Sequence, residues 1–214
     1  MPVKINEREY RNLINFRALE EDEDNKDNAY IVEGYAAVFD EVYTLYEDSY
    51  LKLDEVVLKE AFDDVDLTDV IFQYDHAGRV FARTSNDTLT LEVDDKGLKI
   101  RAYLGGTEEG RNLYEEIKGG YTTKMSWGFS LDRNMDIERL ESYNKETDKY
   151  YELQKIKGIT KIYDVSAVSL PANNATEISA RNLAAGEAER IKAERQERLD
   201  IDKQKLILKL KLEV

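Results

Sequence analysis

The stretch Lys124-Met125-Ser126-Trp127-Gly128-Phe129-Ser130-Leu131 alternates between large apolar and small polar residues. Successive side chains of a β-strand point to opposite faces, so the alternation predicts a strand with two unlike faces. One face carries Met, Trp, Phe and Leu and is expected to pack on a core. The other carries two serines and a glycine, which leaves room for another group near the backbone. Ser126 on this thin face is either a structural residue packed against a neighbouring strand or a nucleophile.

The composition of the 214-residue chain excludes several kinds of site. There is no cysteine, which excludes disulfides, thiolate metal sites and a cysteine nucleophile. The single histidine, His76, excludes a multi-histidine metal site. A net charge of −14 disfavours non-specific binding to nucleic acid. We therefore expect no metal, no cofactor and no nucleic-acid partner.

The distribution of apolar residues predicts a soluble, intracellular protein. No apolar run approaches the roughly 18 residues that span a bilayer. The first residues, Met1 to Glu7, lack the apolar core of a signal peptide. Hydrophobic residues make up 42% of the chain, which is enough for a real core. The length suits one domain with an appendage, or two small domains.

Other segments predict a chain rich in β-structure. Thr107 can cap a helix that ends at Gly119-Gly120. Residues 133–158 are polar, and their pattern indicates only a loop excursion from the main domain or a hairpin. A turn of composition Asp-Asp-Lys-Gly joins two alternating runs into a predicted β-hairpin over residues 88–104. The other segments predicted as strands are 30–39, 55–58, 70–74 and 159–170.

The composition shifts from about Asn173, and we predict a main domain over residues 1–182 and a charged helical C-terminal arm over residues 183–214. Residues 187–214 hold seven acidic and eight basic residues, whereas the rest of the chain is strongly acidic. Residues 187–204 are rich in helix-forming residues, and residues 206–212 fit either a helix or a strand. The arm is a helix that needs a partner, a segment removed in maturation, or a frayed surface helix.

A serine, a histidine and an acid in one site would activate a hydroxyl as a nucleophile. If such a site exists, its base is His76, because the chain has no other histidine. Asp164 is the candidate acid, since it stands in an apolar strand where an uncompensated carboxylate is costly. Each residue also has a plainer interpretation. His76 would be exposed or internally paired, and Asp164 would be a charge at a strand edge in contact with water.

These residues stand in segments that resemble the HK97-type prohead protease family of tailed phages and related prophages. The similar segments run in order across about residues 30 to 180. Each is short, but their order and spacing together are specific. They are Gly34 to Asp40, Glu60 to Phe62, the strand ending in His76, Asp95 to Leu98, Thr107 to Gly110, Met125 to Phe129, and Asp164 to Asn173.

The resemblance implies a serine endopeptidase that trims capsid and scaffold proteins, and in some cases itself, inside the immature shell. It also implies a fold related to that of herpesvirus assemblins. The expected fold class is α+β, with a mostly antiparallel β-barrel flanked by a few helices. Residues 1–182 would form the catalytic domain, followed by the charged helical arm of residues 183–214.

The resemblance assigns Ser126 as the nucleophile, His76 as the general base and Asp164 as the third catalytic member. By the same analogy, the oxyanion hole would come from the loop after the last strand. Its donors would be the backbone amides of Ala172 and Asn173, because Pro171 before them has no N–H. No metal takes part in this chemistry.

The sequence departs from the family pattern at two positions. The family usually has glutamate where Asp164 stands, so the reach here is one methylene shorter. The family often has aspartate directly after the histidine, but here Ala77 follows and Asp75 precedes. Asp75 is therefore the alternative third member, and Gly128 is an alternative oxyanion donor.

The implied substrates are the major capsid protein and its scaffold segment, met in the host cytoplasm inside the viral prohead. No membrane partner is implied, and the sequence leaves open whether the chain forms a homo-oligomer. The alternative function is a non-catalytic capsid assembly or scaffolding protein on the same fold, which suits the acidic composition and the helical arm. A hydrolase of small esters fits less well, because Lys124 rather than glycine stands two residues before Ser126.

Overall fold

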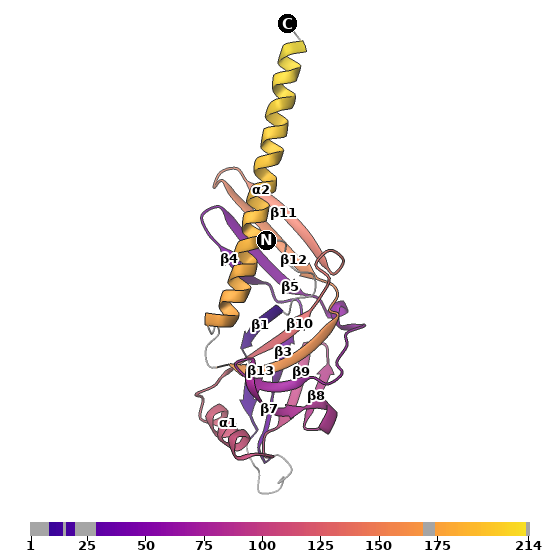
Figure 1. Ribbon diagram of the computed structural model, residues 1–214, viewed down its shortest axis with the longest axis vertical. Helices are drawn as coiled ribbons and strands as arrows, with labels where there is room; N and C mark the ends of the chain where they lie inside the picture. Colours follow the sequence, from indigo (N-terminus) through magenta and orange to yellow (C-terminus); the bar gives the residue numbers. More distant parts are fainter. Residues whose placement is uncertain (1–8, 15, 20–28, 169–173, 213–214) are drawn as a thin grey trace.

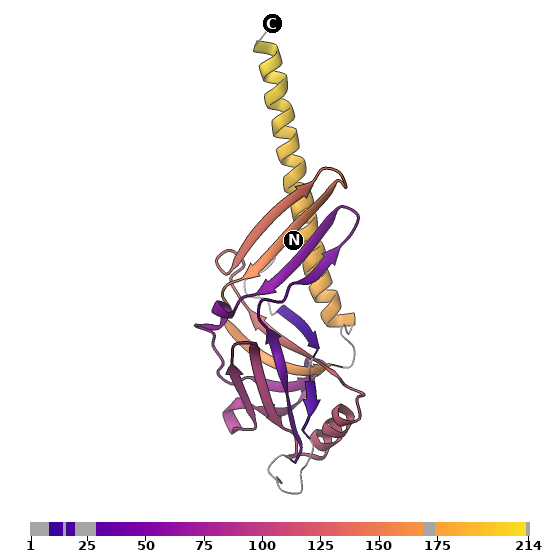
Figure 2. The same cartoon turned by 180° about the vertical axis from the view of Figure 1, so that it is seen from behind.

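The computed structural model describes residues 9–14, 16–19, 29–168 and 174–212 and has an α+β fold. Its strands lie in three sheets, and the long helix α2 runs along one side of the molecule (Figure 1). Seen from behind, the same helix extends well beyond the strands (Figure 2). Most ladders are antiparallel, and the exceptions in the described part of the chain are β12 with β5 and β13 with β6.

The first sheet contains the strand predicted from the alternating stretch. That strand, β10, lies between β1 and β13, and β13 also pairs with β6. β6 continues into β7 through a tight turn. The strands of this sheet are β1 (Glu9–Ile14), β6 (Ile71–Tyr74), β7 (Ala77–Arg83), β10 (Lys124–Ser130) and β13 (Lys161–Val168).

The predicted hairpin of residues 88–104 is confirmed, and it belongs to a sheet with the order β2-β3-β9-β8. The polar segment 133–158 forms the hairpin β11–β12, which joins β5 and β4 in another sheet. The strands of these two sheets are β2 (Phe16–Ala18), β3 (Ile31–Val38), β8 (Leu89–Val93), β9 (Gly97–Tyr103), β4 (Tyr43–Glu47), β5 (Leu51–Val57), β11 (Ile137–Asn144) and β12 (Lys149–Ile156).

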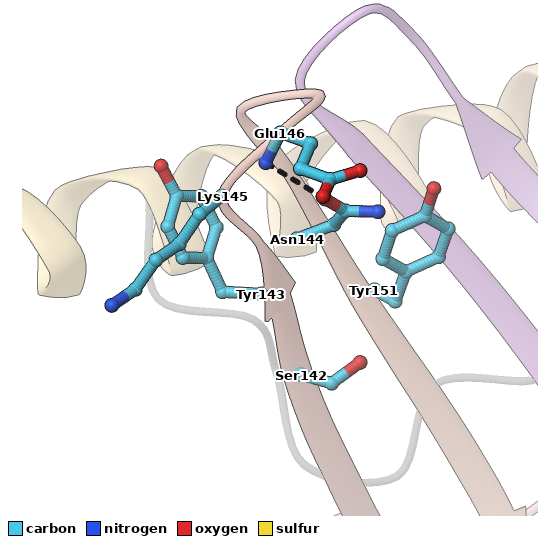
Figure 3. A pocket seen from close by; sticks show the side chains of 6 residues that line it. All are labelled: Ser142, Tyr143, Asn144, Lys145, Glu146 and Tyr151. Atoms are coloured by element: carbon cyan, nitrogen blue, oxygen red, sulfur yellow. Dashed lines mark hydrogen bonds between the residues drawn. The ribbon is translucent and has the colours of Figure 1, made fainter.

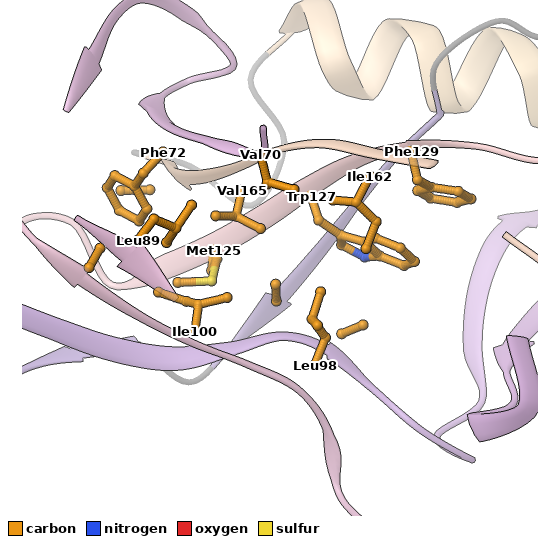
Figure 4. Close-up of a cluster of buried hydrophobic side chains, with 14 of the residues drawn as sticks. Val70, Phe72, Leu89, Leu98, Ile100, Met125, Trp127, Phe129, Ile162 and Val165 are labelled. Carbon is orange, nitrogen blue, oxygen red and sulfur yellow. The ribbon is translucent and has the colours of Figure 1, made fainter. Parts of the chain in front are cut away.

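The apolar face of β10 packs on the core, as predicted. Met125, Trp127 and Phe129 are almost fully buried, and the rings of Trp127 and Phe129 stack with centroids 4.1 Å apart. Side chains from β6, β8, β9 and β13 surround them (Figure 4). Burying a large apolar side chain stabilises a fold by about 1.5–3 kcal/mol, so this face fixes β10 firmly in its sheet.

The predicted barrel is not confirmed as a closed ring. The N-terminal strands connect two sheets, because β1 pairs with β10 and β2 pairs with β3. The sheet that contains β10 ends at β7, and the sheet that contains β3 ends at β8. A barrel made of these two sheets could therefore close only between β7 and β8. β7 and β8 contact each other, but no hydrogen-bonded ladder joins them among the described residues.

The predicted helix after Thr107 is confirmed as α1 (Glu108–Lys118). Its cap is the expected one, because Thr107 Oγ1 accepts a hydrogen bond of 3.0 Å from the backbone N–H of Gly110. A short 3₁₀ helix, Lys59–Phe62, follows β5.

The arm belongs to α2 (Asn174–Leu212), which shows that residues 206–212 are helical. The predicted domain boundary between residues 182 and 183 falls inside this helix and stays a prediction. α2 packs against β1, β4 and β5. Among the described residues, no helix combines the length and the apolar character that crossing a bilayer requires.

Candidate active site

The register between β10 and β13 brings the small residues of both strands together. Ser126 lies directly opposite Ser166, and Gly128 lies opposite Asp164. These positions alternate with Trp127 and the other core residues, so they share the second face of the sheet. This is the thin face predicted from the sequence, and it collects two hydroxyls and one carboxylate.

His76 joins this face from the two-residue turn between β6 and β7. Tyr74 pairs with Ala77 around the turn, and Asp75 and His76 both have positive φ, 49° and 55°. This geometry is that of a type I′ turn, which usually contains Asn or Gly. A non-glycine residue in this region costs about 1–2 kcal/mol. The turn is fixed to β13, because the N–H of Asp75 donates to the carbonyl of Ala167 at 2.9 Å.

The structure brings Ser126, His76 and Asp164 into contact. His76 Nε2 lies 2.6 Å from Ser126 Oγ, and His76 Nδ1 contacts Asp164 Oδ1. An ionised carboxylate only accepts hydrogen bonds, so Nδ1 carries the proton that is shared with Asp164. Nε2 is then the acceptor for the hydroxyl of Ser126, which is the arrangement that a general base needs.

Ser166 is a member of this cluster that the sequence did not identify. Its Oγ donates to Asp164 Oδ1 at 3.0 Å, and the residue is fully buried. Asp164 Oδ2 is also buried, and no group in the described part of the chain bonds to it. The only available signal was the position of Ser166 two residues after Asp164, on the same face of the strand.

The cluster is enclosed in this conformation. Ser126 is 0% exposed, and the side chains of His76 and Asp164 are 3% and 1% exposed. Removing water strengthens electrostatic interactions between the three groups. The interpretation of Asp164 as a water-exposed edge charge is wrong, because β13 lies inside its sheet.

The remaining residues that the sequence suggested for the site are Ala172, Asn173 and Asp75. Ala172 and Asn173 lie outside the described residues, so their role as oxyanion donors stays a prediction. Asp75 holds the turn, and the two ring nitrogens of His76 contact Ser126 and Asp164. Among the described residues, no group of three or more His, Cys, Asp or Glu side chains is arranged to hold a metal ion.

A surface hollow of about 600 Å³ lies at the turn between β11 and β12 (Figure 3). Its lining includes Asn144, whose side-chain oxygen accepts a hydrogen bond of 2.9 Å from the N–H of Glu146. Ser126, His76 and Asp164 are not among the residues that line this hollow. The full lining is Ser142, Tyr143, Asn144, Lys145, Glu146 and Tyr151.

Comparison with known families identifies the chain. Residues 17–190 match the family described as caudovirus prohead serine protease, a range that includes Ser126, His76 and Asp164. Searches of curated proteins and of solved structures gave no significant match. The family implies a serine peptidase with a role in capsid maturation. The chain therefore belongs to the caudovirus prohead serine protease family.

Proposed function

We propose that this protein is a serine endopeptidase that cleaves capsid and scaffold proteins during prohead maturation. Ser126 is the nucleophile, His76 is the general base, and Asp164 orients His76. The observation that carries the proposal is the 2.6 Å separation between His76 Nε2 and Ser126 Oγ, in a chain that has only one histidine. The family match supports the reaction class.

The reaction follows from the hydrogen bonds of the cluster. Ser126 Oγ attacks the carbonyl carbon of the scissile bond while its proton passes to His76 Nε2. His76 then gives this proton to the leaving amine, which leaves an acyl ester on Ser126. Water, deprotonated by His76, attacks the ester, and His76 returns the proton to Ser126 Oγ as the ester bond breaks and the acid product leaves. Asp164 stabilises the imidazolium in both steps, and the backbone amides of Ala172 and Asn173 hold the oxyanion.

The substrates we propose are the major capsid protein with its scaffold segment, any separate scaffold protein, and this chain itself. They would be cleaved in the host cytoplasm, inside the prohead. The arm of residues 183–214 would direct the protein into the prohead or be removed by self-cleavage. Mass spectrometry of mature particles tests the second role, because an intact arm after maturation excludes its removal.

Ser126→Ala tests the proposal directly. The variant and the wild type are each co-expressed with the capsid protein of the same phage, and the mass of the capsid protein is measured. Loss of the nucleophile is expected to lower turnover by about six orders of magnitude, so the capsid protein should stay full length. Ser130→Ala is the matched control, because Ser130 is a buried serine on the same strand.

The same experiment separates the enzyme from a non-catalytic assembly protein. Unchanged processing with Ser126→Ala would exclude Ser126 as the nucleophile. Labelling of the wild type by a fluorophosphonate, located by mass on the peptide that contains Ser126, provides an independent readout. An assembly protein on this fold would not take the label.

A further inference from the structure

Helix α2 passes the tips of two hairpins, β4–β5 and β11–β12 (Figures 1 and 2). Tyr50 directly precedes β5, Tyr143 lies in β11 and Tyr150 lies in β12. The ring centroid of Tyr150 is 5.6 Å from that of Tyr50 and 4.7 Å from that of Tyr143. The N–H of Tyr150 also donates to the carbonyl of Tyr50 at 2.7 Å, which joins the two tips. We call Tyr50, Tyr143 and Tyr150 the tyrosine clamp.

Arg195 of α2 lies in the tyrosine clamp. Its guanidinium carbon is 4.3 Å from the ring centroid of Tyr150, 4.7 Å from that of Tyr143 and 5.0 Å from that of Tyr50. All three distances are within the roughly 6 Å at which an aromatic face attracts a cation. Arg195 Nη1 also donates to the hydroxyl of Tyr50, and the side chain is only 18% exposed. Three rings therefore hold one guanidinium that is largely withdrawn from water.

Two neighbours on the same face of α2 extend this contact. Ile191 is buried against Leu51, and Lys192 Nζ lies 3.2 Å from Asp48 Oδ2. Residues three and four positions apart lie on one face of a helix, so Ile191 and Lys192 reach the body together with Arg195. The described side chains of α2 after Arg195 are all exposed. Arg195 is thus the last described side chain of α2 that is partly withdrawn from water.

We propose that the tyrosine clamp is a docking site for the C-terminal arm, and that its occupation by Arg195 protects the arm from proteolysis. An isolated helix with few buried residues is barely stable in water, because tertiary packing supplies most of the stability of a helix. Among the described residues 189–209, Ile191 is the buried one. A protease cuts the chain where it opens locally, at a rate that follows the population of the open form. Release of Arg195 should therefore make the arm a substrate.

The inference rests on the proposed function only for the identity of the protease that cuts the arm in the prohead. The arm is a proposed target of self-cleavage, and the tyrosine clamp would set the rate at which it is removed. The docking itself depends on contacts within this chain. It can therefore be tested with an added protease in a variant that lacks the proposed nucleophile.

Limited proteolysis of the full chain by a glutamate-specific protease tests the clamp in a Ser126→Ala background. Glu194 and Glu197 lie beside Arg195, so cleavage of the arm is read by mass. Arg195→Ala should raise the rate of arm cleavage about five- to thirtyfold, because it removes a desolvated cation–aromatic contact. Arg198→Ala is the matched control, since Arg198 is an exposed arginine three residues further along α2, and it should leave the rate within about twofold.

A substitution on the body tests the same contact and leaves the sequence of the arm unchanged. Tyr143→Leu removes one ring of the clamp and should raise the rate of arm cleavage at least about threefold. Tyr151→Leu is its control on the same hairpin. Tyr143 and Tyr151 are 37% and 36% exposed, but Tyr151 follows Tyr150 directly and so points to the other face of the sheet.

Hydrogen exchange provides a readout that does not depend on the added protease. The backbone amides of residues 187–198 should exchange faster in Arg195→Ala, by a similar factor, and not in Arg198→Ala. Equal cleavage rates for Arg195→Ala, Tyr143→Leu and their parent chain would overturn the proposal. Rises of the same size in Arg198→Ala or Tyr151→Leu would overturn it too.

Restoring Ser126 tests the regulation of self-cleavage. Arg195→Ala should then lose its arm faster than the wild type, as measured by the mass of the chain over time. An arm that stays intact in this variant, while capsid protein is processed, would show that the clamp does not regulate self-cleavage. Capsid processing that Ser126→Ala leaves unchanged would contradict the proposed function instead, and the cleavage rates with the added protease would still decide the docking.

Discussion

Ser126 on β10 and Ser166 on β13 lie directly opposite each other. The hydroxyl of one contacts His76, and the hydroxyl of the other contacts Asp164, the residue with which His76 pairs. Ser126 Oγ lies 2.6 Å from His76, whereas Ser166 Oγ donates to Asp164 at 3.0 Å. The ladder between the two strands therefore sets the proposed nucleophile, Ser126, and the hydroxyl that supports Asp164 at one level of the sheet. This relationship predicts a positioning role for Ser166 that can be tested separately from catalysis.

Ser166→Ala should lower kcat and leave KM nearly unchanged. A hydrogen bond to a charged group contributes about 1.5–3 kcal/mol, so the expected fall is about 10–100-fold if the bond serves mainly to orient Asp164. KM should hold because Ser166 is fully buried and holds the acid rather than the substrate. The measurement is steady-state cleavage of a capsid-protein peptide that contains a mapped cleavage site.

Two further variants and one spectrum separate positioning from general damage. Ser166→Thr keeps the hydroxyl and should recover most of the activity, whereas Ser130→Ala removes another buried hydroxyl and should have little effect. The Nδ1–H resonance of the only histidine can be read by proton NMR without ambiguity. An unchanged resonance and unchanged kcat in Ser166→Ala would exclude the positioning role.

Asp164→Asn should lower kcat by about 10⁴-fold, the loss seen when the acid of a serine-protease triad becomes an amide. An amide can donate to His76 Nδ1 and so favours the tautomer in which Nε2 carries the proton and cannot accept from Ser126. Asp75→Asn is the comparison, since Asp75 directly precedes His76. If Asp75→Asn abolished cleavage and Asp164→Asn did not, the third catalytic role would belong to Asp75.

The strands that carry the cluster were predictable because their patterns are local. The alternation around Ser126 reflects one buried face and one thin face, and residues 88–104 contain both strands of a hairpin and its turn. His76 and Asp164 could be selected by elimination and by an unusual charge in an apolar strand. Their contact could not be predicted from pattern alone, because it depends on the parallel pairing of β6 with β13.

The segments that the sequence missed are those whose structure depends on distant partners. The sequence of β1 has little pattern of its own, and β1 is held in place by its ladder with β10, which lies about half the chain length away in sequence. β4 is short and partly exposed, and it exists because β5 pairs with it. The turn at Asp75 and His76 has no glycine or asparagine, so the usual signal for a type I′ hairpin is absent.

Arg11→Ala should destabilise the fold by about 3–5 kcal/mol, the usual cost of breaking a buried ion pair. Arg11 on β1 makes two hydrogen bonds to Glu55 on β5, of 2.5 and 2.7 Å, and both side chains are almost fully buried. The variant leaves the carboxylate of Glu55 enclosed without its cation. Urea unfolding at neutral pH measures the change.

Arg17→Ala is the control for that variant, because Arg17 pairs with Glu33 at the surface. Exposed ion pairs contribute about 0–1 kcal/mol, so the control should unfold at nearly the wild-type urea concentration. Equal effects of the two substitutions would mean that the pair of Arg11 and Glu55 does not join β1 to β5 in solution.

Tyr43→Phe should reduce stability at neutral pH and change its dependence on alkaline pH. The hydroxyl of Tyr43 donates to Glu55, and burial together with the charge of Glu55 raises the pKa of Tyr43 well above its usual value of 10.0. Folding therefore favours the protonated phenol. This contribution is complete below about pH 10 and is lost as the pH rises from there toward the higher folded-state pKa.

The difference in free energy of unfolding between wild type and Tyr43→Phe should thus narrow above about pH 10. Urea unfolding of both proteins at about pH 8, 9.5 and 11 measures it, with the exposed Tyr121 changed to phenylalanine as the control. A difference that stays constant across this range would show that Tyr43 titrates alike in the folded and unfolded chains.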